Sequence, residues 1–85
     1  MVSNYNRAIE LDPNDAKAYS DRAWLKQNQK HDADGALADY DRAIALDPKL
    51  TEALTSRAAI KEWQKKDFYG ALADYSAAIL AEPSS

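Results

Sequence analysis

Few side chains in this sequence have the chemistry of a metal-binding or catalytic site. The single histidine, His31, stands in the stretch His31-Asp32-Ala33-Asp34, where imidazole and carboxylate groups are both common metal ligands. The corresponding stretch further along the chain, Lys65-Lys66-Asp67, offers no matching cluster of imidazole and carboxylate groups. We therefore predict no metal site and expect the aspartates to begin a helix.

Catalytic arrangements of other kinds are also missing from the sequence. Gly35 and Gly70 are isolated glycines, so they do not form a phosphate-binding loop. No serine has a histidine base within a shared site, which argues against a hydrolytic triad. Asp39 and Asp41 are two positions apart, so on a helix they point to different faces and are expected to be solvated. We predict no enzyme activity and no cofactor.

The composition is that of one small soluble domain. The chain has 85 residues, of which 46% are hydrophobic and 29% charged, with no cysteine and a formal net charge of −3. Nucleic-acid binding needs clustered Lys and Arg, and the pair Lys65-Lys66 is too short for that. No apolar run approaches the roughly 18–20 residues that span a bilayer. We expect a protein that binds neither nucleic acid nor membrane and is cytoplasmic rather than secreted.

The sequence repeats itself with a period of 35 residues. The three prolines are Pro13, Pro48 and Pro83, and the segment Ala36-Leu37-Ala38-Asp39-Tyr40 recurs unchanged at residues 71–75. A repeat with this period is typical of stacked supersecondary units. We expect a half repeat at residues 1–13, full repeats at 14–48 and 49–83, and a tail at 84–85.

Each full period predicts two helices. Ala36, Leu37, Tyr40, Ala43 and Ile44 form one apolar helical face, and the Asp-Pro step at 47–48 ends that helix. We expect Asp15 and Thr51 to cap the preceding helices, and Asp32 or Asp34 to cap this one. The predicted helices span residues 1–11, 16–29, 34–46, 52–65 and 69–81.

Large residues early in the first helix and small residues one turn later occupy fixed places in each period, as do the residues of the second helix. These positions are Tyr19 and Leu54, Ala23 and Ala58, Ala36 and Ala71, Tyr40 and Tyr75, Ala43 and Ala78, and Pro48 and Pro83. In their order and spacing they resemble the tetratricopeptide repeat family. The resemblance implies an all-α fold of antiparallel helix-turn-helix repeats, stacked as an α-solenoid with a right-handed superhelix.

The sequence departs from the family pattern in two ways. The period is one residue longer, and we place the extra residue in the turns near 29–31 and 64–66. Charged residues also stand where the family often has Leu and an aromatic residue: Arg22, Lys26, Arg57 and Lys61. We expect their apolar stems to pack while their charged ends reach water or Asp39 and Asp74.

The family resemblance implies that the first helix of each pair lines a concave groove that binds a peptide or protein. The positions on that side are Lys17, Ser20, Asp21, Trp24, Gln27 and Asn28, then Glu52, Thr55, Ser56, Ala59, Glu62 and Trp63. Trp24 is either a binding hot spot or a packing residue. Trp63 is expected to close over Phe68. A clamp for acidic tails would need several cations, and only Lys17 offers one.

We predict a protein-interaction scaffold that holds a partly apolar peptide or a protein surface. The alternative is self-assembly, as a homodimer or with exchanged helices, through end helices that no neighbour covers. Met1-Val2 falls in mid-repeat, so we expect a segment of a longer array or a designed repeat with no natural ligand.

Overall fold

The computed structural model describes the backbone of residues 3–81 and the side chains of residues 6–81. Within this range the chain forms helices and no strands. The helices are α1 (Ser3–Leu11), α2 (Ala16–Asn28), α3 (Ala33–Leu46), α4 (Thr51–Trp63) and α5 (Phe68–Ala81). The predicted all-α fold is confirmed, and each described helix boundary lies within two residues of its expected position. Met1-Val2, Pro83 and the tail at 84–85 lie outside the described residues.

Local hydrogen bonds explain where most helices begin. The carboxylate of Asp15 accepts the N–H of Ala18 at 3.3 Å, and Asp32 accepts the N–H of Gly35 at 2.9 Å, so both aspartates are N-caps. The expected cap at Thr51 is wrong. The Leu50 carbonyl already accepts from the N–H groups at 53 and 54, which places Thr51 inside the first turn of α4.

The turns within the two helix pairs have the same unusual backbone. His31 and Lys66 have φ values of 53° and 55°, in the left-handed region that favours glycine. In each turn the next residue, Asp32 or Asp67, donates its N–H to a carbonyl six residues earlier. These turns contain the positions where we placed the extra residue of each period.

Small residues allow the helices to approach one another closely. Ala23, Ala36 and Ala43 are fully buried in one cluster, and the only large side chains that are fully buried among the described residues are Tyr40 and Ile60. Alanine buries little apolar area, so close backbone approach rather than bulky side chains fills this core. The expected positions of the small residues are therefore confirmed.

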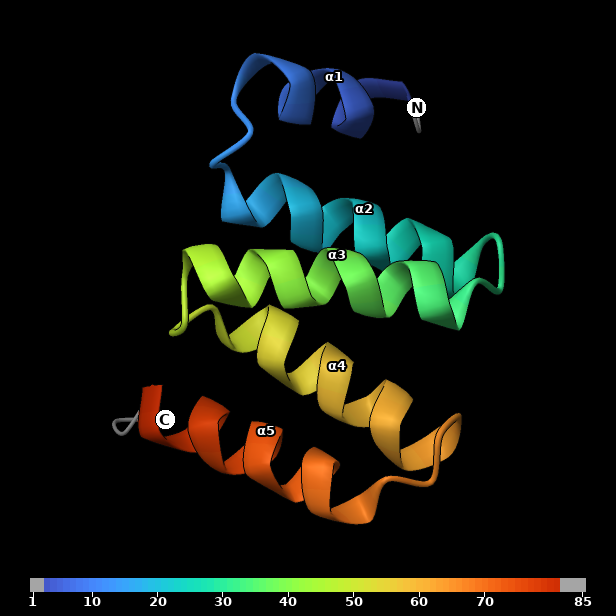
Figure 1. Cartoon of the computed structure of the whole chain (residues 1–85), viewed down its shortest axis with the longest axis vertical. Coiled ribbons are helices and arrows are strands. Elements are labelled where there is room, and N and C mark those ends of the chain that lie inside the picture. Colours follow the sequence, from blue (N-terminus) through green and yellow to red (C-terminus); the bar gives the residue numbers. More distant parts are fainter. Residues whose placement is uncertain (1–2, 82–85) are drawn as a thin grey trace.

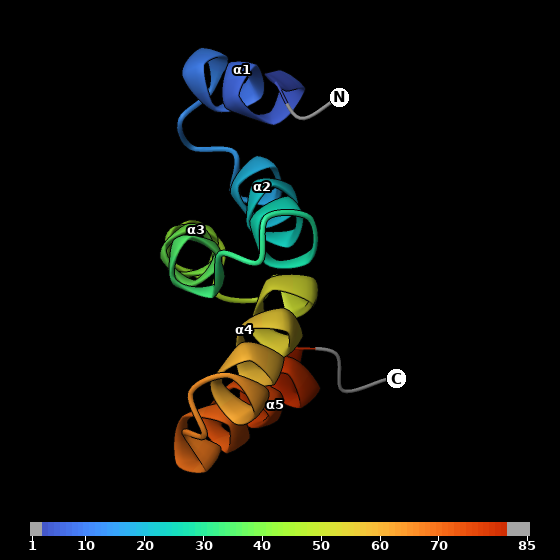
Figure 2. The ribbon, with the colours of Figure 1, turned by 90° about the vertical axis from the view of Figure 1, so that its right-hand side faces the viewer.

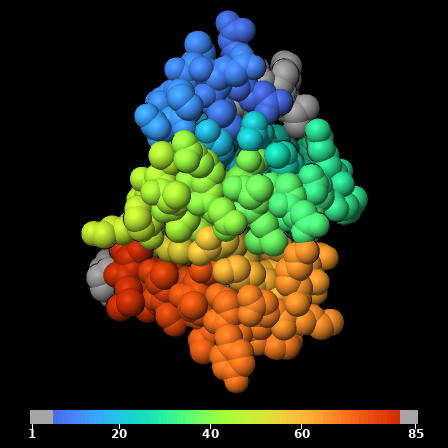
Figure 3. Space-filling view, viewed as in Figure 1, coloured from blue at the N-terminus to red at the C-terminus, as the bar shows by residue number. Residues whose placement is uncertain are grey.

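The helices stack in chain order. Figure 1 shows them following one another from α1 to α5 along the longest axis, and the coloured bands of the space-filling view succeed one another in the same order (Figure 3). Contacts join α1 to α2, α2 to α3, α3 to α4 and α4 to α5, with a smaller contact between α2 and α4. This arrangement is a helical repeat, in which each element is covered mainly by its neighbours in sequence. Within the described residues no helix is both long and apolar enough to cross a bilayer.

Candidate functional site

The first helices of the two pairs, α2 and α4, lie beside each other and are joined by an ion pair between equivalent helical turns. Figure 2 shows α2 and α3 on opposite sides of the stack, with α4 below α2. Lys17 Nζ lies 2.9 Å from Glu52 Oε1 and 3.7 Å from Asp21 Oδ1. The hydrogen bond to Glu52, aided by the charges of both carboxylates, raises the pKa of Lys17. The one cation among the predicted groove residues is thus already paired.

Trp24 of α2 is partly exposed to solvent. Its exposed fraction is 53%, and Asn28 Nδ2 donates to the Trp24 carbonyl at 3.0 Å, one turn further along the helix. A tryptophan that packed in the core would be largely buried. Packing against a neighbouring helix therefore explains only the buried part of the Trp24 side chain.

Trp63 differs from what the sequence led us to expect. It is 74% exposed, and Phe68, over which it was expected to close, is also largely exposed. The expected closure is therefore wrong. Trp63 is the last residue of α4, directly before the turn, and that position leaves its ring in solvent.

The other predicted groove residues divide by burial. Ser20 is buried, so its hydroxyl is closed to a ligand, whereas Thr55, its counterpart 35 residues later, is exposed. Gln27 and Glu62 are half-buried and accept hydrogen bonds from the hydroxyls of Tyr40 and Tyr75, each at 3.3 Å. Burial, followed by the nearby Glu62 carboxylate, raises the pKa of Tyr75. Ser56 and Ala59 are half-buried.

A buried carboxylate joins the two helices of each pair. Asp39 on α3 receives Arg22 Nε at 2.8 Å, Arg22 Nη2 at 2.7 Å and Lys26 Nζ at 3.0 Å, all from α2. Burial alone would raise the pKa of Asp39, but the hydrogen bonds and charges of the two cations outweigh it, and the pKa lies below its ordinary value. The expected contact of these cations with Asp39 is confirmed. The expectation that Asp39 is solvated is wrong, because it is buried against them.

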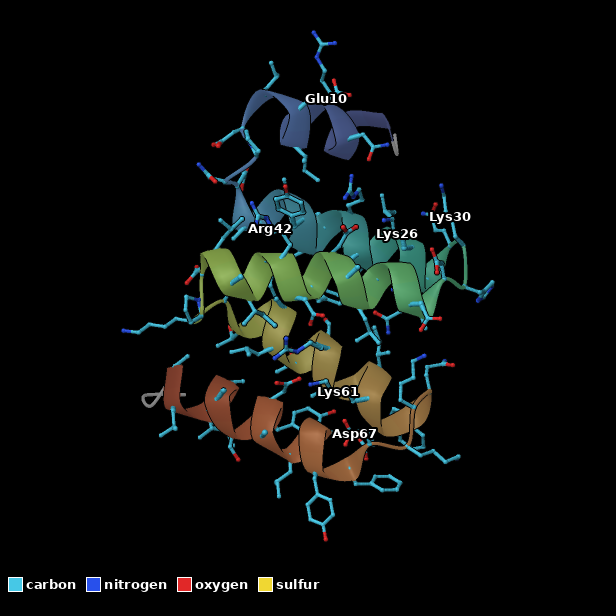
Figure 4. The ribbon with its side chains drawn as sticks, viewed as in Figure 1. Glu10, Lys26, Lys30, Arg42, Lys61 and Asp67 are labelled. Atoms are coloured by element: carbon cyan, nitrogen blue, oxygen red, sulfur yellow. The ribbon has the colours of Figure 1, made fainter. Side chains whose placement is uncertain are left out.

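The second pair repeats this arrangement. Asp74 on α5 binds Arg57 through two bonds of 2.7 and 2.8 Å and lies 3.2 Å from Lys61 Nζ. Lys26 and Lys61 are labelled at their equivalent places on α2 and α4 in Figure 4. Arg57 also reaches back to Asp41 of the preceding pair at 2.8 Å. These ion pairs are structural, since the carboxylate at each centre is closed to solvent.

The remaining chemical candidates are dispersed. His31 and Asp34 are exposed in the α2–α3 turn region, where Asp34 pairs with Lys65 and Asp32 caps α3. Among the described side chains, no group of three or more histidines, aspartates or glutamates is placed to hold a metal ion.

Comparison with known families agrees with the repeat in the structure. Residues 4–38 match the family model described as "Tetratricopeptide repeat". No curated protein sequence matches the chain. Residues 39–81 continue the same pattern at a spacing of 35, with the same ion pairs and turns. Residues 4–38 are thus similar to the tetratricopeptide repeat family, and the rest of the described chain repeats their pattern.

Proposed function

We propose that this chain binds a peptide or a protein segment on the side formed by α2 and α4, with Trp24 as the main contact. Tetratricopeptide repeats commonly mediate protein–protein interactions, so a binding role agrees with the family. The observation that carries the proposal is the half-exposed Trp24, which lies on the same helix as Lys17, the partner of Glu52. A rigid aromatic side chain of this kind supplies apolar contact area at a low entropic cost.

The charges of the predicted groove residues define the class of ligand. Among the twelve predicted groove residues, Lys17 is the one cation, whereas Asp21, Glu52 and Glu62 are anions, which leaves a net charge of −2. Because Lys17 is paired with Glu52, a ligand carboxylate would meet no free cation among these residues. We therefore infer a ligand that combines an apolar side chain for Trp24 with Lys or Arg for the carboxylates.

The test is a selection of displayed random peptides on the immobilised chain, followed by affinity measurements. We expect the selected peptides to be enriched in basic and apolar residues. Replacing Trp24 with Ala should weaken their binding about thirtyfold, the loss of ~2 kcal/mol that is typical of a hot spot. Tyr69→Ala is the matched control, because Tyr69 is an exposed aromatic residue on α5, away from α2. Its affinity should not change.

Thermal unfolding of the same variants separates binding from folding. Because Trp24 is already 53% exposed, Trp24→Ala should lower the free energy of unfolding by no more than about 1 kcal/mol. Equal affinities of the Trp24→Ala and Tyr69→Ala variants would refute the groove. A loss of several kcal/mol in stability would identify Trp24 as a core residue instead.

A further inference from the structure

A small hollow lies between α1 and α2, away from the α2–α4 side. It has a volume of about 50 Å³ and is lined by Asn6, Arg22, Leu25, Lys26 and Lys30. Lys26 and Lys30 are labelled near the end of α2 in Figure 4. The lining includes three cations and no anion, so this hollow differs in charge from the predicted groove, whose net charge is −2.

The hollow is positive because its cations share a single carboxylate. Arg22 and Lys26 both bind Asp39, at 2.7 and 3.0 Å. Lys30 Nζ has no ion-pair or hydrogen-bond partner among the described residues. Asp32, the nearest carboxylate to Lys30 along the chain, is occupied as the cap of α3. Three cations and one carboxylate leave a net charge of +2 at this place.

The unpaired polar groups of the lining side chains are mainly hydrogen-bond donors. An arginine has five N–H groups and a lysine has three. Arg22 donates three of its N–H groups to Asp39 and Asn6, and Lys26 donates one to Asp39. Asn6 accepts from Arg22 through Oδ1 at 3.0 Å, which leaves its side-chain NH2 group as a donor. A ligand that enters the hollow therefore meets N–H groups above all.

Two of the three cations are poorly hydrated. The side chains of Arg22 and Lys26 are only 26% and 29% exposed, whereas Lys30 is exposed. Positive charge that is partly buried and not balanced by an anion is costly. An anion in the hollow would reduce this cost, and its hydrogen bonds to charged donors would be strong.

We propose that the hollow between α1 and α2 binds a phosphate group. A phosphate monoester carries a charge of about −1.5 to −2 at pH 7, which balances the site, whereas a single carboxylate would balance only half of its charge. Its three outer oxygens are strong acceptors for the N–H groups of Arg22, Lys26 and Lys30. The hollow has space for about three or four waters, which is similar to the space that these oxygens need.

The second helix pair indicates a matched variant that should close the site. Asp41 stands there in the place of Asn6, 35 residues later. Its Oδ1 accepts from Arg57 Nη1 at 2.8 Å, in the same way as the amide oxygen of the first pair accepts at 3.0 Å. Asn6→Asp should therefore keep this bond and the fold while it adds a negative charge to the hollow.

The probe is inorganic phosphate, titrated into the isotopically labelled chain at constant ionic strength and followed by two-dimensional NMR. We expect saturable shifts of the Arg22 Nε–H signal, with a Kd in the millimolar range. Asn6→Asp should weaken binding by at least about tenfold, through repulsion, and Lys30→Gln should weaken it about threefold. Lys49→Gln, at an exposed lysine between α3 and α4, and Trp24→Ala, on the α2–α4 side, should leave it unchanged. Circular dichroism of each variant checks that the fold is retained.

A short Gly-Ser peptide that carries one phosphoserine, together with its unphosphorylated form, identifies the source of the phosphate group. Tighter binding of the phosphopeptide than of inorganic phosphate would support the proposal and assign the site to a phosphorylated protein segment. Equal binding of the two would support it with the free ion as ligand. Equal binding of the unphosphorylated peptide would overturn the proposal. Unchanged affinity in Asn6→Asp, equal losses in Lys30→Gln and Lys49→Gln, or the absence of a saturable shift would also overturn it.

Discussion

Removing the buried carboxylate of Asp39 should lower the stability of this fold. Asp39 is the shared acceptor for Arg22 and Lys26, with three contacts between 2.7 and 3.0 Å. An Asp39→Ala substitution leaves both cations of α2 facing α3 without the carboxylate that they share. The cost arises mainly from those stranded charges, because each must either lose its partner in a poorly hydrated site or move toward water.

The size of the loss follows from the exposure of the cations. Breaking a buried ion pair by removing one partner costs about 3–5 kcal/mol. The side chains of Arg22 and Lys26 are 26% and 29% exposed, so both can partly rehydrate, and we expect the lower end, about 3 kcal/mol. Asp41 is the matched control on the same helix. Its side chain is 63% exposed, and losing its pair with Arg57 should cost less than about 1 kcal/mol.

Urea unfolding followed by far-ultraviolet circular dichroism measures both variants under the same conditions. A third variant, with Arg22→Met and Lys26→Met added to Asp39→Leu, should recover most of the lost stability, because no charge is then stranded. If Asp39→Ala costs no more than Asp41→Ala, the carboxylate does not anchor the pair. If the triple variant is as unstable as Asp39→Ala, the cost lies in packing and the electrostatic reasoning is refuted.

Three further predictions concern charge, backbone and packing. The pKa values of Asp39 and Asp74 are lowered in the folded chain, so ionisation of these carboxyl groups stabilises the fold above about pH 4. This stabilisation is lost as the pH falls from about 4 through the lowered pKa values. A melting temperature that stays constant in this acidic range would contradict the prediction. His31→Gly should raise the free energy of unfolding by about 1 kcal/mol, because glycine relieves the left-handed backbone, and Lys66→Gly should do the same; urea unfolding checks both, and a loss of stability would count against backbone strain. Ala23→Leu should cost about 2 kcal/mol or more, because Ala23 is fully buried between paired helices; an unchanged urea midpoint would show that the helices have room.

The local features of the fold could be predicted because local residues determine them. The 35-residue period and the apolar stripes give the helices, and Asp15 and Asp32 begin two of them through bonds to N–H groups three residues away. The one wrong cap shows the limit of such reasoning. Thr51 has a favourable side chain for the position, but the backbone N–H groups of Ala53 and Leu54 donate to the Leu50 carbonyl, and these bonds decide where α4 begins.

Features that depend on distant partners could be predicted only in part. Asp39 and Asp41 look alike in the sequence, yet one is buried and the other exposed. Asp39 pairs with Arg22, 17 residues earlier, and Asp41 pairs with Arg57, 16 residues later. Both contacts form only when the helices pack together. The wrong expectation for Trp63 has a related cause, since the sequence does not show whether a neighbouring element covers a helix end.

Exposure in this protein therefore depends on position in the stack as much as on residue type. Leu37 and Leu72 have identical neighbours in sequence, yet the first packs beneath α4 and the second is exposed. The ion pairs do not depend on the next helix, since Arg22–Asp39 lies within the first helix pair and Arg57–Asp74 within the second. Each pair is thus held together by its own charges, whereas the apolar side of a pair is closed only by the next helix. A substitution at Asp39 should accordingly destabilise a pair, whereas one at the exposed Leu72 should cost little stability.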